Sequence, residues 1–136
     1  RFDSALQCTA HRVRIGADNV DALLSGADVV LDGCDNFATR LAVSDACVRL
    51  GISLTSAAVG RFQGQVANFA GHLDGQSCYR CFVGDAFDAE DCDTCAADGV
   101  LGALVGMMGA FAAMQAISTL YSGPASLAST VARAGV

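Results

Sequence analysis

Two aspartates, Asp32 and Asp35, stand in an acidic, glycine-containing turn directly after a short apolar run at residues 29–31. In α/β proteins, ligand-binding groups are commonly placed in the turn at the carboxyl end of a strand. We therefore expect two carboxylates to face a ligand at the active edge of a sheet. The residue types support one alternative equally well, in which one aspartate caps the following helix and the other is solvated.

Seven cysteines form the second set of chemically capable residues, and they include a Cys-x-x-Cys pair, Cys78 and Cys81. Thiolates at this spacing converge on tetrahedral zinc. A second pair, Cys92 and Cys95, follows after only ten residues, which is shorter than the usual spacing between zinc half-sites. The other three are expected to be small buried hydrophobic residues: Cys8, Cys34 and Cys47.

These groups must be positioned by alternating strands and helices. The run at residues 29–31 lacks clean alternation and predicts a strand buried on both faces, as in a parallel sheet. A helix is expected to start near Phe37 and to end at Gly51, the residue type that most often ends helices in a left-handed conformation. The remaining patterns predict an edge strand near 13–15, helical turns at 19–25, strands at 52–59 and 65–69, and a hairpin turn at 74–75 leading into Cys78.

Two long segments differ sharply in charge. Residues 82–98 hold six acids and no base, which is typical of a solvated loop. Residues 99–120 carry no charge, and a helix of that length would span about 33 Å, close to a bilayer core. Each of its four glycines lowers the stability of a helix by about 1 kcal/mol relative to alanine. So many glycines are reasonable only where the helix backbone must come close to another group, so we expect it to lie close to a sheet or to a second subunit. No basic cluster flanks the segment, and we predict a buried helix of a soluble protein.

Composition narrows the function classes. A chain of 136 residues suits one domain, and 53% hydrophobic with 16% charged residues excludes disorder. The net charge of −6 argues against nucleic acid as a partner. All eight basic residues are arginine. A lysine that contacts a phosphate would therefore have to be supplied from outside this sequence. An odd cysteine count without a signal peptide favours a reducing cytoplasm, and the opening Arg1 suggests a piece of a longer chain.

Five short motifs in order resemble the ThiF/MoeB/HesA family, bacterial relatives of the ubiquitin-activating enzymes. The resemblance covers about residues 19–121 and only the later half of the family's domain. The motifs are Leu-Asp-Gly-Cys-Asp-Asn at 31–36 with Thr39 and Arg40, Gly-Gln-Val at 64–66, Cys-Tyr-Arg-Cys at 78–81, Cys95 before Gly-Val-Leu-Gly at 99–102, and the glycine-rich segment to Leu120.

The resemblance implies an α/β fold, a Rossmann-like mixed sheet flanked by helices, which is incomplete here because the N-terminal nucleotide-loop half is missing. We therefore treat residues 1–136 as a single partial domain. The family uses ATP and magnesium to adenylate the C-terminal glycine of a ubiquitin-like sulfur carrier in thiamine, molybdopterin or related sulfur-transfer pathways. It is usually a homodimer, and no membrane or nucleic-acid partner is expected.

The motif positions imply roles for individual residues. Asp35 matches the aspartate associated with magnesium and ATP, in keeping with a metal that takes few protein carboxylates. Asn36, Arg40 and Gln65 match nucleotide-site positions. Arg40 could instead anchor its helix through an internal salt bridge, and Gln65 could be a plain hairpin side chain; both alternatives stay open.

The cysteine motifs imply a metal and a nucleophile. Cys78 and Cys81 match the first half of a structural zinc site, whose second half in the family lies downstream of the glycine-rich helix. No cysteine follows Cys95 here, so the zinc site is expected to be incomplete in this chain. Cys95 matches a cysteine that some members use for sulfur transfer or covalent carrier linkage; a helix N-terminus would favour its thiolate, and the nearby acids would oppose it.

Several features depart from the family pattern. Alanine stands at position 103, where the family usually has proline, and the late helix has Ala112, Gln115 and Ser118 where polar or charged residues are usual. The sequence contains no Gly-x-Gly-x-x-Gly loop, which would seat the phosphates of a nucleotide at a helix N-terminus. We therefore expect this chain alone to be inactive.

Three hypotheses follow. The first is the later part of an ATP-dependent enzyme that activates a sulfur carrier. The second is a non-catalytic, truncated relative that docks a carrier or another partner. The third is half of a nicotinamide or flavin dehydrogenase, since many α/β folds share the strand-turn-helix pattern; the zinc-type cysteines and the Asp-Asn turn argue against it.

Overall fold

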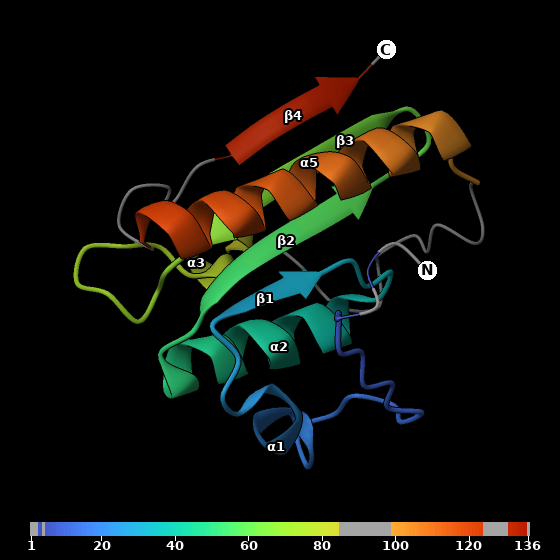
Figure 1. Ribbon diagram of the computed structural model, residues 1–136. Coiled ribbons are helices and arrows are strands. Elements are labelled where there is room, and N and C mark those ends of the chain that lie inside the picture. Colours follow the sequence, from blue (N-terminus) through green and yellow to red (C-terminus); the bar gives the residue numbers. More distant parts are fainter. Residues whose placement is uncertain (1–2, 4, 85–98, 124–130, 136) are drawn as a thin grey trace.

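A computed structural model describes residues 3, 5–84, 99–123 and 131–135 (Figure 1). Its centre is one mixed sheet in the order β1-β2-β3-β4. The parallel pair β1–β2 is followed by antiparallel pairs β2–β3 and β3–β4. The strands are β1 Val29–Asp32, β2 Ser53–Val59, β3 Gln63–Phe69 and β4 Val131–Gly135. The predicted Rossmann-like mixed sheet flanked by helices is confirmed.

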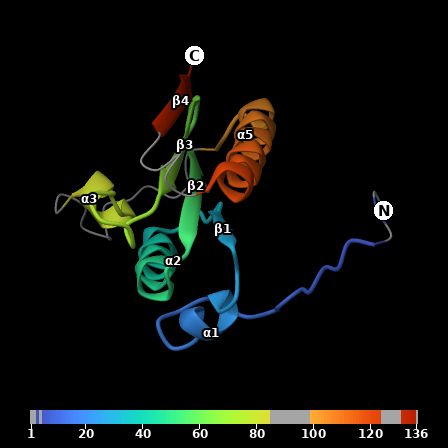
Figure 2. The same cartoon turned by 60° about the vertical axis from the view of Figure 1, so that its left-hand side comes forward.

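Helices cover both faces of this sheet (Figure 2). On one face lie α2, Phe37–Leu50, and α3, Tyr79–Val83; on the other lies α5, Gly102–Ser122. The short helix α1, Val20–Leu24, packs against α2.

Helix α2 begins and ends where the sequence predicts, at Phe37 and before Gly51. The Asn36 side chain accepts a hydrogen bond from the Thr39 amide at 2.8 Å, which caps the first turn. At the other end Gly51 adopts a left-handed φ of 72°, and the Ile52 amide donates to the Cys47 carbonyl at 2.9 Å. This pattern satisfies the last carbonyls of the helix and turns the chain into β2.

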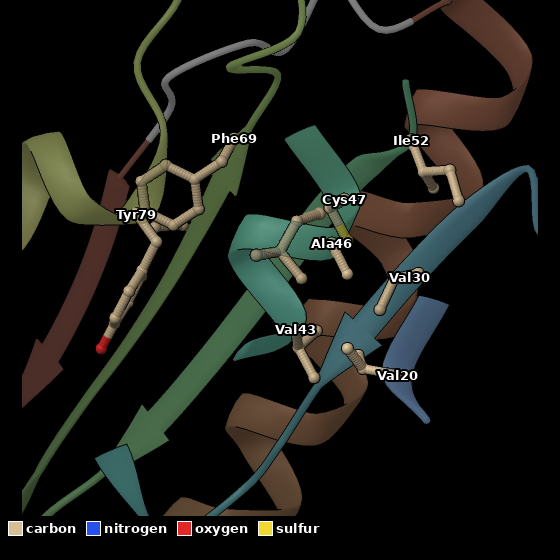
Figure 3. Packing of buried hydrophobic residues seen from close by; sticks show 10 residues of the cluster. Val20, Val30, Val43, Ala46, Cys47, Ile52, Phe69 and Tyr79 are labelled. Atoms are coloured by element: carbon tan, nitrogen blue, oxygen red, sulfur yellow. The ribbon is translucent and has the colours of Figure 1, made fainter. Parts of the chain in front are cut away.

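The main core lies between the sheet and α2, where mostly small residues allow close packing (Figure 3). Val43, Ala46 and Cys47 of α2 are nearly inaccessible to solvent. Phe69 of β3 and Tyr79 of α3 meet edge-to-face, with ring centroids 5.5 Å apart. Such a pair adds roughly 0.5–1.5 kcal/mol beyond the area it buries, and it holds α3 against the sheet.

On the opposite face α5 packs one side only. Leu104, Met108 and Ala112 are buried against Val66 of β3. Farther along, the Gln115 side-chain oxygen accepts a hydrogen bond from the Asn68 amide nitrogen at 2.8 Å. The outer side of α5 is exposed, so the prediction of a buried helix is wrong for that side.

Within the described residues, α5 is the one helix long and apolar enough to cross a membrane by length and composition. The core helix of a soluble protein passes the same test, and in this fold α5 lies along the sheet. Its glycines do not mediate the predicted close approach to the sheet, because a Cβ at Gly102, Gly106 or Gly109 would meet no heavy atom within 4 Å. The close approach occurs at Gly64 of β3 instead, where a Cβ would lie 2.5 Å from Met108 Cγ. Close approach of the α5 glycines to a second subunit stays a prediction.

The structure corrects three further expectations. Residues 13–15 form no strand, and Val13 is exposed. The turn at 74–75 forms, but it leads into α3 instead of a hairpin strand; the β2–β3 hairpin is closed by residues 60–62. Strand β1 is buried on one face only, since it lies at the sheet edge and Leu31 is 49% exposed on the other.

Candidate functional site

A cavity of about 550 Å³ lies where β1 and β2 end, the edge at which α/β proteins bind ligands. Its volume is within the range of small-molecule sites. Aromatic and aliphatic side chains from three helices form much of its wall, namely Phe37, Tyr79, Phe82, Val105 and Met108. Its charged and amide-bearing residues are Asp35, Arg40, Gln65 and Arg133.

Only one of the two predicted carboxylates borders this cavity. Asp35 lies in the turn between β1 and α2 and lines the cavity wall. Asp32 is the last residue of β1, its side chain is 1% exposed, and it points to the α2 side of the sheet. The expectation that both carboxylates face a ligand is therefore wrong for Asp32. The capping alternative is also wrong, because Asn36 caps α2.

The partner of Asp32 is Arg40. Arg40 Nη1 lies 3.0 Å from Asp32 Oδ2 and donates to Ser56 Oγ at 2.7 Å. The Ser56 hydroxyl in turn donates to Asp32 Oδ2 at 3.0 Å. We call these three residues, Asp32, Arg40 and Ser56, the Arg40 network. Breaking a buried pair of this kind from one side costs about 3–5 kcal/mol, since it leaves a buried charge without a partner.

Two other predicted nucleotide residues are placed differently. Gln65 lines the cavity from β3, where it pairs with Ala58 of β2 on one side and Arg133 of β4 on the other. Asn36 lies beside the cavity turn, and its side-chain oxygen is engaged as the α2 cap. The structure thus brings Asp35, Arg40 and Gln65 to one cavity and leaves Asn36 next to it.

Cys34, which lines the cavity, is a poor nucleophile. Burial raises the pKa of the Cys34 thiol to about 12, and the neighbouring Asp32 carboxylate adds to that effect. Cys47 is buried in the α2 core, as predicted, and burial raises its pKa to about 12 as well. Cys8 is exposed, which contradicts the prediction that it is buried, because the segment before α1 packs against little of the core.

Cys78 and Cys81 converge, as a zinc half-site requires. Their sulfur atoms lie 3.4 Å apart at the start of α3. The pair alone offers two ligands, and the described part of the chain contains no group of three or more His, Cys, Asp or Glu residues that could hold a metal. A closed tetrahedral site would thus need two ligands from elsewhere. Cys92 and the predicted nucleophile Cys95 lie outside the described residues.

Sequence reasoning missed several residues of this region. Arg133 comes from a tail without a recognisable pattern, and only its pairing with β3 brings it to the cavity. Tyr79 and Phe82 lie in and directly after the Cys-x-x-Cys motif, and they were not predicted to line a cavity. Ser56 could have been identified from the sequence, because it is one of three hydroxyl residues in an otherwise apolar strand.

Comparison with known proteins gives consistent matches. A family model described as "ThiF family" matches residues 1–134. The "Adenylyltransferase and sulfurtransferase MOCS3" of Mus musculus is 46% identical over 81 residues, which cover 60% of this chain and 17% of the relative. The "Sulfur carrier protein adenylyltransferase" of Thermus thermophilus is 43% identical over 75 residues, 53% of this chain and 28% of the relative.

An archaeal relative agrees with these two. The "SAMP-activating enzyme E1" of Haloferax volcanii is 40% identical over 73 residues, which cover 54% of this chain and 26% of the relative. In each of these comparisons the matched part is under a third of the relative's length.

Proposed function

The chain belongs to the ThiF family, and on that premise we propose that it forms part of an ATP-dependent site that adenylates the C-terminal glycine of a ubiquitin-like sulfur carrier. The observation that carries the proposal is the cavity at the carboxyl end of β1, with Asp35 in its wall. Two of the similar proteins are named adenylyltransferases, and one of these is named for a sulfur carrier.

Asp35 is the residue we assign to magnesium. It is an acidic residue of the cavity wall, and Asp32 is already engaged by Arg40 and Ser56. Magnesium takes one or two protein carboxylates and leaves the rest of its shell to phosphate oxygens and water, so one carboxylate fits. When bound, the ion would neutralise charge that develops on the phosphate.

The other cavity residues bind and orient. Gln65 offers an amide to the nucleotide from β3, and Arg133 offers a guanidinium from the neighbouring strand. The aromatic wall formed by Phe37, Tyr79 and Phe82 gives the base or the carrier tail an apolar surface. Arg40 also lines the cavity, and Asn36 caps the first turn of α2, the helix that carries Arg40.

The chain alone supplies only part of this machinery. It contains no Gly-x-Gly-x-x-Gly loop and no lysine, so the phosphates need groups beyond this sequence. A second candidate function is that of a non-catalytic relative that docks a carrier or another partner. The proposal also includes a cytoplasmic location, a homodimer, zinc at Cys78 and Cys81, and a sulfur-linked role for Cys95. It includes no membrane partner.

ATP–pyrophosphate exchange tests the proposal. We would measure it with magnesium and candidate sulfur carriers, for this chain and for the protein of its complete reading frame. We expect exchange in the longer protein only. Asp35→Ala should lower it by roughly 10²–10³-fold, because a preorganised charge at the reacting phosphate is lost.

The matched control is Asp45→Ala, which removes a carboxylate of α2 that pairs with Arg80 and lies outside the cavity wall. Asp45→Ala should leave exchange near the wild-type rate. Silence of both proteins with every carrier would reject adenylation and favour the docking function. Full activity of Asp35→Ala would remove Asp35 from the site.

A further inference from the structure

The Arg40 network connects three segments that meet at the cavity. Arg40 belongs to α2, Asp32 ends β1, and Ser56 lies in β2 directly opposite Asp32 in the parallel register. Arg40 Nη2 also donates to two backbone carbonyls, that of Cys34 and, at 2.6 Å, that of Ala57. One side chain thus bonds to both strand ends and to the turn between β1 and α2.

The turn is held from a second direction. The Cys34 amide donates to Asp32 Oδ1 at 2.8 Å. Each Asp32 oxygen therefore has a defined partner, the turn amide on one side and Arg40 with Ser56 on the other. Because Asp35 is the next residue of the same turn, the position of its backbone depends on these bonds.

Two of the three residues of the Arg40 network lie outside the cavity wall. Residues 33–35 and 57–59 line the cavity, whereas Asp32 and Ser56 do not. Arg40 borders the cavity, but it donates four hydrogen bonds to groups of the protein itself, out of the five N–H groups that a guanidinium has. The side chain as a whole is 9% exposed.

We propose that Arg40 is a positioning residue: together with Asp32 and Ser56 it fixes the turn that carries Asp35 and the end of β2, and it does not itself bind the nucleotide. This inference rests on the proposed function for the identity of the ligand. If Arg40 acts in this way, Ser56 is as important for nucleotide binding as Arg40, although Ser56 does not touch the cavity.

The first experiment needs no ligand. In the protein of the complete reading frame, residue-resolved amide hydrogen exchange would be compared for wild type, Arg40→Lys and Ser56→Ala. These conservative changes are preferred, since an alanine at position 40 would leave Asp32 buried without a partner. We expect the Cys34 amide to exchange roughly tenfold faster in both variants, because local opening of the turn becomes easier.

The Ile52 amide serves as the internal reference, because it bonds to Cys47 at the far end of α2. It should exchange at the wild-type rate in both variants. Unchanged exchange at Cys34 in both variants would overturn the proposal, whatever the protein binds.

The second experiment is a double-mutant cycle on the affinity for Mg²⁺–ATP, with a non-hydrolysable ATP analogue as the probe. We expect Arg40→Lys and Ser56→Ala each to weaken binding by roughly tenfold, and the double variant to be no weaker than Arg40→Lys, because both changes break one network. Arg49→Lys is the matched control, an exposed arginine of the same helix paired with Asp21, and it should bind like wild type.

A different pattern would show direct contact. If Ser56→Ala binds like wild type while Arg40→Lys binds weakly, Arg40 touches the nucleotide and the positioning role is wrong. If wild type does not bind the analogue at all, the proposed function fails, and the exchange rate of the Cys34 amide still decides whether Arg40 positions the turn.

Discussion

At the level of single residues, the two aspartates of one short turn have different environments. Asp32 is held by a guanidinium and a hydroxyl inside the protein, while Asp35 borders a cavity. The division follows from strand geometry, because a residue in a strand points to one face of the sheet and Asp32 points to the α2 side. It leaves Asp35 as the carboxylate that is available to a ligand.

Because the thiol of Cys47 is buried, we predict that the free energy of unfolding depends on pH. Burial raises the pKa of the folded thiol from 9.0 to about 12, so between these values the unfolded chain releases a proton that the folded chain retains. Stability must then fall as the pH rises, by up to about 1.4 kcal/mol per pH unit. From pH 9 to pH 10, wild type should lose about 1 kcal/mol more than Cys47→Ala in urea unfolding under reducing conditions.

Cys34 is present in both proteins, so its own ionisation cancels in this comparison. Equal losses for wild type and Cys47→Ala would show that the buried thiol ionises in the folded state as readily as in the unfolded chain.

At the level of elements, β3 and α5 approach each other at a glycine that belongs to the strand. A Cβ at Gly64 would meet Met108 Cγ at 2.5 Å and Met108 Sδ at 2.7 Å, and both atoms belong to a buried side chain. The glycines of α5 itself face open space. The strand glycine, and not the glycine-rich helix, therefore sets the distance between the sheet and α5.

A pair of alanine substitutions tests this assignment. Gly64→Ala should lower the free energy of unfolding by about 1–3 kcal/mol, because Met108 or the whole helix must move. Gly106→Ala should raise it by up to about 1 kcal/mol, because the helix interior gains a better helix former without a clash. Chemical denaturation of both variants measures the two effects. Changes of the same sign would contradict a close contact between Gly64 and Met108.

At the level of the whole molecule, the outer side of α5 carries large exposed apolar residues. Met114 is 57% exposed and Ile117 66%, and Leu120 and Tyr121 continue the same surface. Contiguous apolar surface of this kind is typical of protein–protein contacts. We place the second copy of the proposed homodimer on this side of α5.

Sedimentation or light scattering of the protein of the complete reading frame tests that placement. Ile117→Lys should weaken dimerisation by roughly 100-fold, because a charge would be buried without a partner at the centre of the contact. Val48→Lys changes an exposed apolar residue of α2 and should leave the dimer unchanged. A wild-type protein that is monomeric at all concentrations, or an unaffected Ile117→Lys, would rule this contact out.

The features that could be predicted from sequence are those with local causes. Helix α2 starts at Phe37 and ends before Gly51, as predicted, and the bonds at its two ends reach only three to five residues along the chain. The short run before Asp32 and the patterned segments after Gly51 likewise identify β1, β2 and β3, and the order of motifs identified the family. The place of Asp35 beside a cavity could also be expected, because the turn after a strand is a place where α/β proteins bind ligands.

The rest depended on contacts between distant parts of the chain. Asp32 is unavailable to a ligand because Arg40, eight residues later, and Ser56, twenty-four residues later, meet it inside the fold. Arg133 reaches the cavity because β4 pairs with β3 across more than sixty residues of sequence. Such pairings follow from which strands are neighbours and which face each side chain takes, and neither is encoded in the residues next to it along the chain.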